Sequence, residues 1–229
     1  KLAENPEIER IYCAPGNGGI SVQATPVDIK ATDVEGMVAF AKKEGIDFAV
    51  VTPDDPLVLG MADAMEEAGV PAFGPSKKAA QIEGSKVFAK NLMKKYGIPT
   101  AKYKVFDDPV KVVEYIEREN CFPAVIKADG LALGKGVVIA KNLEEAKEAV
   151  HSIMEDKIFG KSGSQIVIEE FLTGPEVSVL SFTDSHVVVP MISSMDHKRA
   201  LDGDKGLNTG GMGTVAPNPF YTEKVARQC

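Results

Sequence analysis

Residues 125–137 read VIKADGLALGKGV: an apolar strand that ends in Lys127, followed by a loop with three glycines and a second lysine, Lys135. Glycines let backbone N–H groups approach phosphate oxygens closely, and a lysine adds a movable positive charge. The loop leads into another strand, whereas the Walker A motif GxxxxGK[ST] leads into a helix. An exposed hairpin with solvated lysines is the alternative, but Lys127 follows an apolar strand and should lie at the edge of a core. The stretch therefore favours a phosphate-binding hairpin.

The residues around this hairpin predict an α+β region. Helices should follow the N-cap residues Ser85, Asp108 and Asn142, because each precedes a stretch with helical spacing. We expect strands at Tyr103–Phe106, Ala124–Lys127, Val137–Ala140, Gln165–Phe171, Glu176–Thr183 and His186–Ile192. Short turns between successive strands indicate an antiparallel sheet, with the helices on one side of it.

The first hundred residues alternate strand and helix signals instead. Thr32 and Glu35 have capping-box spacing before a periodic stretch that ends near Gly45, and a second helix should run from Leu57 to Gly69. The strands should be Ile8–Ala14, Ile46–Val51 and Val70–Phe73. The second of these is a continuous apolar run, which is typical of a strand covered on both faces. Alternating strands and helices imply parallel pairing, so this region should be an open α/β domain.

Residues 166–172, IVIEEFL, form an apolar strand that ends in two acids and an aromatic ring, and Glu176 follows a few residues later. Exposed backbone there can pair with the edge of a purine. One carboxylate can accept from the exocyclic amine, and a later one can hold the ribose hydroxyls. The alternative is an edge strand whose charges block aggregation, and the segment taken alone favours that alternative.

Two polar stretches come next, Asp196–Arg199 (DHKR) and Asn208–Gly213 (NTGGMG). The glycine turn can direct N–H groups at an anion. His197 is a candidate base, although a lone histidine in a polar loop is more often solvated. Asp202–Gly206 lacks the spaced acids and closing glutamate of a calcium loop, which excludes that site. Near the start, residues 14–19 could hold a phosphate, but they lack GxGxxG and no helix follows directly.

Composition narrows the classes of function. The 229 residues are 44% hydrophobic, which suggests one to two domains. A net charge of -7 without a basic stripe argues against a nucleic-acid partner. The longest apolar runs are too short to cross a bilayer, and no signal-peptide pattern is present, so we expect no membrane association. Cys13, Cys121 and Cys229 lack CxxC spacing, which predicts reduced thiols in a cytosolic protein.

Asp54 and Asp55 follow a predicted strand and could be ligands in a crevice at its C-terminal end. The sequence slightly favours the alternative, that they are ordinary turn residues.

Together these motifs resemble the phosphoribosylamine–glycine ligase family, also called glycinamide ribonucleotide synthetases, of the ATP-grasp superfamily. The matching segments are Ala14–Asn17, Pro56–Val58, Phe73–Pro75, Glu83–Lys86, Val125–Gly136, Ile168–Leu172, Asp196–Arg199 and Asn208–Gly213. They span nearly the whole chain in the family's order, and the lysine–glycine stretch with the DHKR and NTGGMG pair is the most specific part.

The resemblance implies a doubly wound domain at 1–84, a central ATP-grasp lobe from 85–103 and 175–229, and a lid lobe at 104–174. It implies that ATP is bound by Lys86, Lys127, Gly130, Gly134, Lys135, Gly136, Glu169, Glu170, Phe171, Leu172 and Glu176. The implied residues of the glycine and phosphoribosylamine side are Pro15, Gly16, Asn17, Asp196, Lys198, Arg199, Asn208, Thr209, Gly210 and Gly211. Lys127 and Arg199 would take part in catalysis.

The implied reaction joins glycine to 5-phosphoribosylamine through glycyl phosphate, with ATP and Mg²⁺ or Mn²⁺ as cofactors. The partners would be these small molecules, and a monomer is the expectation. Three departures stand out. The family's opening glycine-rich turn would precede Lys1, its metal-holding Glu-x-Asn-x-Arg segment would follow Cys229, and residues 52–55 (TPDD) replace the commoner Gly-Pro-Glu. We therefore expect a fragment without metal ligands. The alternatives are another ATP-grasp ligase or carboxylase, and an inactive ATP-binding fragment.

Overall fold

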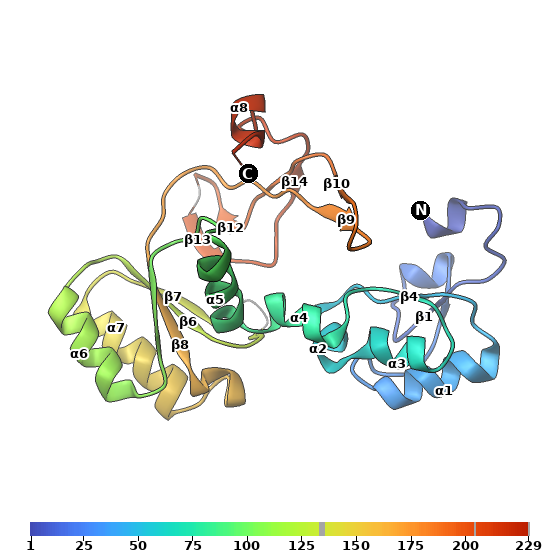
Figure 1. Cartoon of the computed structure of the whole chain (residues 1–229), viewed down its shortest axis with the longest axis horizontal. Helices are drawn as coiled ribbons and strands as arrows, with labels where there is room; N and C mark the ends of the chain where they lie inside the picture. Colours follow the sequence, from blue (N-terminus) through green and yellow to red (C-terminus); the bar gives the residue numbers. More distant parts are fainter. Residues whose placement is uncertain (133–135, 204, 229) are drawn as a thin grey trace. The chain divides into compact units, whose positions relative to one another are not determined.

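The computed structural model describes residues 1–132, 136–203 and 205–228. They form two units, Lys1–Phe171 and Leu172–Cys229, which are treated separately below. Figure 1 traces both along the sequence from blue to red. None of the described helices is both long and apolar enough to cross a membrane.

The N-terminal part of the first unit pairs its strands in parallel, which confirms the α/β prediction. β1 (Tyr12–Cys13) pairs with β2 (Thr25–Pro26), and β3 (Ala49–Val50) pairs with β4 (Ala72–Phe73). The helices are η1 (Leu2–Glu4), η2 (Ile20–Val22), α1 (Val34–Glu44), α2 (Asp54–Leu59), α3 (Met61–Glu67) and α4 (Lys77–Gly84). Their core gathers apolar side chains from α1 to α4 and the strand ends, including Ala41, Leu57, Met61, Met65 and Val70.

Three local predictions in this part are wrong. Asp33, not Thr32, caps α1, because its Oδ1 accepts from Gly36 N at 2.9 Å and the helix begins one residue later than expected. The second helix starts at Asp54 and breaks at Gly60, whose φ of 96° suits a residue without a side chain. Val50 is 45% exposed, so the Ile46–Val51 run is not covered on both faces as expected, and β3 pairs only with β4 among the described strands.

The second part of the first unit is a four-stranded antiparallel sheet, as predicted. β5 (Tyr103–Phe106), β6 (Ala124–Ala128), β7 (Val137–Ala140) and β8 (Ile166–Glu170) lie in the order β5-β8-β6-β7. The N-caps predicted for α5 (Lys86–Tyr96), α6 (Pro109–Glu119) and α7 (Leu143–Val150) are confirmed. A π-helical turn, η3 (His151–Glu155), and η4 (Gly160–Ser164) connect α7 to β8.

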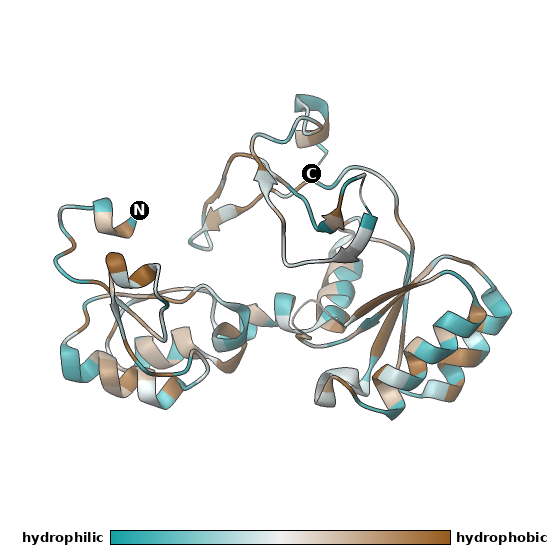
Figure 2. Ribbon diagram, turned by 180° about the vertical axis from the view of Figure 1, so that it is seen from behind, coloured by the Kyte–Doolittle hydropathy of each residue, from teal (hydrophilic) through white to brown (hydrophobic). Residues whose placement is uncertain are grey.

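Helices α6 and α7 cover one face of this sheet (Figure 1). Their buried residues, such as Val112 and Val150, pack against Ile126 and Ile166, and all four are almost completely buried. In Figure 2 the strands of this sheet carry brown, hydrophobic stretches, while α6 and α7 alternate brown and teal. Such a sheet needs helices on only one face to exclude water from its core.

The strand β8 corrects another expectation. The sequence favours an edge strand at 166–172, or exposed backbone for a purine, but β8 bonds to β5 on one side and to β6 on the other. The hydrogen-bonding groups of Ile166–Glu170 are therefore directed at neighbouring strands, and backbone outside the ladder begins only at Phe171.

The second unit consists of short strand pairs. β9 (Ser181–Thr183) and β10 (Val188–Pro190) form a hairpin where two longer strands were predicted. β11 (Met195–Asp196) pairs with β14 (Thr214–Val215), and β12 (Arg199–Leu201) pairs with β13 (Lys205–Asn208). The short helix α8 (Glu223–Ala226) starts at the N-cap Thr222.

Candidate functional site

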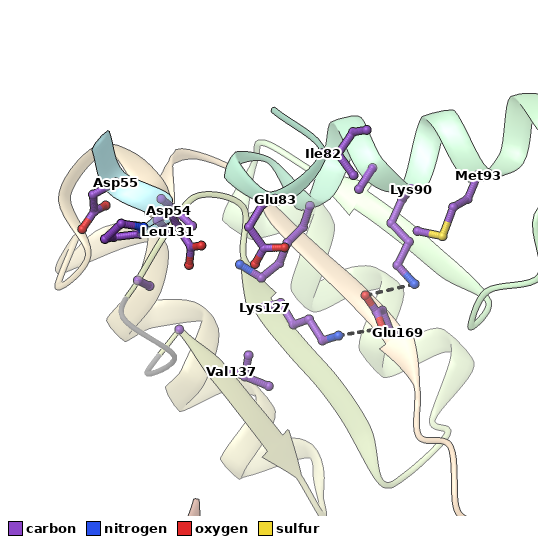
Figure 3. A pocket seen from close by; sticks show the side chains of 15 residues that line it. Asp54, Asp55, Ile82, Glu83, Lys90, Met93, Lys127, Leu131, Val137 and Glu169 are labelled. Atoms are coloured by element: carbon purple, nitrogen blue, oxygen red, sulfur yellow. Dashed lines mark hydrogen bonds and ion pairs between the residues drawn. The ribbon is translucent and has the colours of Figure 1, made fainter. Parts of the chain in front are cut away.

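A cavity of about 670 Å³ lies in the first unit, between the start of α2, the end of α4, α5 and the strands β6 to β8. Its walls are mostly apolar, and the charged members are Asp54, Asp55, Glu83, Lys86, Lys90, Lys127 and Glu169. Figure 3 shows the two aspartates at the opposite end of the cavity from Lys90 and Glu169. The pocket holds four carboxylates and three lysines, so its total charge does not favour an anion; the candidate anion contacts are two of the lysines, Lys86 and Lys127.

Lys127 stands one residue before the end of β6, and its Nζ lies 2.9 Å from Oε2 of Glu169 on β8. Lys90 of α5 approaches the same carboxylate from the other side, with its Nζ 3.2 Å from Oε1 (Figure 3). Glu169 and Lys90 are buried, whereas about a quarter of the Lys127 side chain (26%) is exposed. Lys127 is therefore the member of this trio whose charge is accessible from the cavity.

Lys86 opens α5 and extends along the loop that follows β6. Its Nζ donates to the carbonyl oxygens of Gly130 at 3.0 Å and Asp129 at 3.4 Å. Burial lowers the pKa of Lys86 from its ordinary value of 10.5, and the nearby charge of Lys127 lowers it further, while Asp129, Glu83 and Glu169 act in the opposite direction. The charge of Lys127 is thus near enough to act on Lys86, and two neighbouring lysines are suited to share one multiply charged ligand.

Asp129 joins β6 to α5. Its carboxylate accepts from Ser85 Oγ and from Val87 N, the latter at 2.8 Å, and its carbonyl accepts from Lys86 N at 3.1 Å. We call these three contacts the Asp129 junction. Because the junction fixes the start of α5 against the end of β6, it also fixes the separation between Lys86 and Lys127.

The predicted glycine loop is described only at its ends, and Gly134 and Lys135 lie outside the described residues. Gly130 has no room for a side chain, because a Cβ would overlap the Ser162 hydroxyl. At Gly136 a Cβ would come within 2.6 Å of the Ala132 Cβ. Both glycines are therefore required by close packing, independently of any ligand.

The carboxylates predicted for the adenine side are already occupied by protein partners. Glu169 pairs with two lysines, and Glu170 Oε1 accepts from Lys102 N at 2.8 Å. Phe171 is 40% exposed, and Leu172, the first residue of the second unit, is 64% exposed. The β8 strand ends at Glu170, so Phe171 and Leu172 lie outside its ladder.

In the second unit the DHKR and NTGGMG stretches lie side by side. His197 N donates to Gly213 O at 2.9 Å, and Thr209 N donates to Lys198 O at 2.7 Å. Asp196 lies so near Gly211 that a Cβ there would be 2.9 Å from its Oδ1.

The two cationic residues predicted for the substrate side, Lys198 and Arg199, each have a protein partner. Arg199 Nη1 donates to Gly206 O at 2.8 Å, and Arg199 faces Asn208 across the β12–β13 pair. Lys198 Nζ lies 2.6 Å from Oε1 of Glu176. The contact with Lys198 places Glu176 beside a residue predicted for the other two substrates. Gly210, another of those predicted residues, belongs to the Asn208–Gly213 stretch.

Pro15, Gly16 and Asn17 are not among the residues that line the cavity. Gly16 has a φ of 76°, and Asn17 Oδ1 accepts from the N–H of Ile20, the first residue of η2, at 2.9 Å. A short 3-10 helix therefore follows this turn, contrary to the expectation that no helix follows it directly.

Sequence reasoning missed Lys90, Asp129 and Glu83. A signal for Lys90 was present: it follows Lys86 by one helical turn and shares that face of α5 with Ala89 and Met93, which also line the cavity. No local pattern marks Asp129, because its partners are more than forty residues away. In the described part of the chain, no group of three or more His, Cys, Asp or Glu side chains is arranged to hold a metal ion.

Comparisons with known proteins agree with this arrangement. The profile described as "Phosphoribosylglycinamide synthetase, N domain" matches residues 1–83, and "Phosphoribosylglycinamide synthetase, ATP-grasp (A) domain" matches residues 84–229. The phosphoribosylamine–glycine ligase of Clostridium acetobutylicum is 47% identical over 227 residues, which cover 99% of this chain and 54% of that protein. The ligase of Vibrio vulnificus is 48% identical over 227 residues, covering 98% and 53%.

Solved structures give the same relation. The crystal structure of phosphoribosylamine–glycine ligase from Thermotoga maritima matches with a TM-score of 0.76 and 33% identity, covering 93% of this chain and 51% of that one. N5-carboxyaminoimidazole ribonucleotide synthetase from Thermus thermophilus, at 20% identity and a TM-score of 0.66, shares the fold and covers 96% and 54%. The chain spans about half the length of the curated relatives it matches. Since the two profiles together account for every residue, the chain belongs to the phosphoribosylglycinamide synthetase family of ATP-grasp proteins.

Proposed function

We propose that this chain binds ATP in the α5–β6–β8 cavity and forms part of an enzyme that joins glycine to 5-phosphoribosylamine. The observation that carries the proposal is the convergence of Lys86 and Lys127 beside the glycine loop, in a cavity of about 670 Å³. That pairing of cations and close-packed glycines suits a triphosphate. The family relatives named above supply the substrate class.

The residue roles follow from position. Lys127, partly exposed at the end of β6, would contact the phosphates, and Lys86 would reach them from the start of α5. The backbone from Phe171 to Leu172 would bind the purine, since the strand before it has no free edge. Glu176, and the Asp196–Arg199 and Asn208–Gly211 segments, would serve the ribose and the other two substrates. The division at residues 103 and 174 into central and lid lobes stays a prediction.

The proposed reaction has two steps. A glycine carboxylate oxygen attacks the γ-phosphorus, the bond to the β-phosphate oxygen breaks, and ADP leaves glycyl phosphate behind. The amine of phosphoribosylamine then attacks the carbonyl carbon, phosphate departs with the acyl C–O electrons, and the amine loses a proton. The lysines stabilise charge on the phosphoryl oxygens and hold the reactants in line, so the protein contributes positioning and electrostatics more than acid–base chemistry.

We propose Mg²⁺ or Mn²⁺ as the accompanying cation, because Mg²⁺ is commonly bound by one or two carboxylates together with phosphate oxygens. Within the described ranges, no group of three or more His, Cys, Asp or Glu side chains could hold this cation by itself. The free thiols of Cys13 and Cys121 fit a reducing cytoplasm, and a monomer acting on small molecules is the simplest assembly.

The test is a coupled assay on the full-length gene product with ATP, glycine and phosphoribosylamine. ADP and phosphate should appear only when all three are present, and glycinamide ribonucleotide should accumulate in equal amount. ADP release with another carboxylate, and none with glycine, would instead identify a different ATP-grasp ligase. ATP binding without turnover of any substrate would favour a non-catalytic module.

A further inference from the structure

Lys90 is a buried lysine with no role in the mechanism above. It lies on α5 one turn after Lys86 and is only 6% exposed, whereas Lys94, one turn later, is exposed. A buried ammonium group costs considerable free energy unless it is paired and hydrogen-bonded. Its contacts therefore indicate what it does.

Lys90 Nζ has three partners. It lies 3.2 Å from Glu169 Oε1, donates to Thr100 Oγ1 at 2.7 Å, and sits 5.4 Å from the centre of the Tyr103 ring. An ammonium group has three N–H donors, and the Glu169 carboxylate and the Thr100 hydroxyl are within reach of two of them. Lys90 is thus directed at the protein and not at a ligand in the cavity.

The two oxygens of Glu169 are divided between two lysines, Oε1 with Lys90 and Oε2 with Lys127. Two positive charges and one negative charge leave the trio with a net charge of +1. Without Lys90, the remaining Lys127–Glu169 pair would be neutral, and the free Oε1 would compete with any phosphate for the Lys127 ammonium.

We propose that Lys90 is a positioning residue: by taking up Oε1 of Glu169, it leaves Lys127 with only Oε2 of that carboxylate as an ion-pair partner within the described ranges, and with a net charge that acts on the phosphates of the bound nucleotide. This inference rests on the proposed ATP site. Lys90 touches no substrate in this arrangement, and its effect passes through Glu169.

Calorimetric titration of the full-length polypeptide with Mg·ATP and with adenosine tests it. Lys90→Met keeps the length and removes the charge, and it should weaken ATP binding about tenfold, the range seen for residues of one ion-pair network. Adenosine, which has no phosphate, should bind equally to both proteins. Lys94→Met on the same helix is the matched control and should match the wild type.

A double-mutant cycle separates positioning from general damage. If Lys90 acts through Glu169, then in a Glu169→Gln background the Lys90→Met change should alter ATP affinity by less than about twofold. An equal loss in both backgrounds, or an equal loss for ATP and adenosine, would overturn the proposal. So would an unchanged ATP affinity in Lys90→Met.

Thr100→Val provides a second variant if Lys90→Met does not fold. It removes the 2.7 Å hydrogen bond that orients Lys90, keeps the side-chain shape, and should weaken ATP binding about two- to threefold. No change there would also contradict the proposal. If the wild-type protein binds no ATP, the proposed function itself fails. If the wild type binds ATP and the Lys90→Met and Thr100→Val variants bind it equally well, only the role of Lys90 is rejected.

Discussion

The two units each contain a lysine–glutamate pair, and the pairs differ in burial. Lys198 and Glu176 in the second unit are 2.6 Å apart with side chains 47% and 44% exposed, whereas Lys127 and Glu169 are 2.9 Å apart with 26% and 7% exposed. The shorter pair is the more solvated one. Distance alone is therefore a poor guide to energetic weight: an exposed pair is screened by water, and a buried pair cannot lose one member without stranding the other.

The largest expected effect tests this difference directly. Glu169→Ala leaves Lys90 and Lys127 without their shared carboxylate, and it should lower the free energy of unfolding by about 3–5 kcal/mol. Glu176→Ala removes an exposed partner and should cost about 0–1 kcal/mol. Urea denaturation of the two variants beside the wild type measures both. Equal losses would show that burial does not separate the two pairs.

Lys127→Ala should have the next largest effect, on ligand binding. Loss of a charged phosphate contact in a closed site typically costs ~1.5–3 kcal/mol, so ATP affinity should fall about 10- to 150-fold. Calorimetry with Mg·ATP is the measurement, and Lys94→Ala on the solvent side of α5 is the control. An unchanged affinity would remove Lys127 from the nucleotide site.

Within the second unit, Glu176→Ala should weaken ATP binding more than His197→Ala. A lost hydrogen-bond acceptor for the ribose is worth about 1 kcal/mol, roughly fivefold in affinity. His197 contacts Gly213 O in the loop, and its truncation should change ATP affinity less than about twofold, as surface substitutions generally do. The reverse ranking in the same titration would show that the ribose lies elsewhere.

The smallest expected effect is a pH dependence from Lys86. Burial and the charge of Lys127 lower the pKa of Lys86 below 10.5. As pH rises through that lowered pKa, Lys86 loses its positive charge earlier than an exposed lysine would, so ATP affinity should decline in the alkaline range below 10.5. Lys86→Arg retains the charge there and should flatten the profile. Identical profiles for wild type and variant would exclude Lys86 from the phosphate contacts.

Local features of the fold were predictable from sequence. The N-caps Ser85, Asp108 and Asn142 were correct because a cap depends on residues two or three positions away. The β6–β7 pair was correct because a glycine-rich stretch joins these two strands, whereas helices join β5 to β6 and β7 to β8. The break at Gly60 was missed because glycine inside a helical pattern often continues the helix, and only its left-handed φ distinguishes a break.

Features that depend on distant residues were not predictable in this way. Strand order places β8 between β5 and β6, and no periodicity in 166–172 distinguishes that position from an edge. Lys127 could be predicted as a candidate phosphate contact from its own sequence context. Its partner Glu169, and the Lys90 that shares this carboxylate, come from other elements and could not. The candidate site was thus predictable as a set of motifs and not as a set of contacts.

The Asp129 junction has a consequence for building chimaeras between relatives. The boundary expected at residue 103 assigns Ser85 and Val87 to one lobe and Asp129 to the other, yet the Asp129 carboxylate accepts from Ser85 Oγ and from Val87 N. In a chimaera that exchanges residues 104–174 alone, Asp129 would come from one parent and its donors Ser85 and Val87 from the other. Transplanting residues 85–87 together with the 124–130 segment would keep donor and acceptor from the same parent.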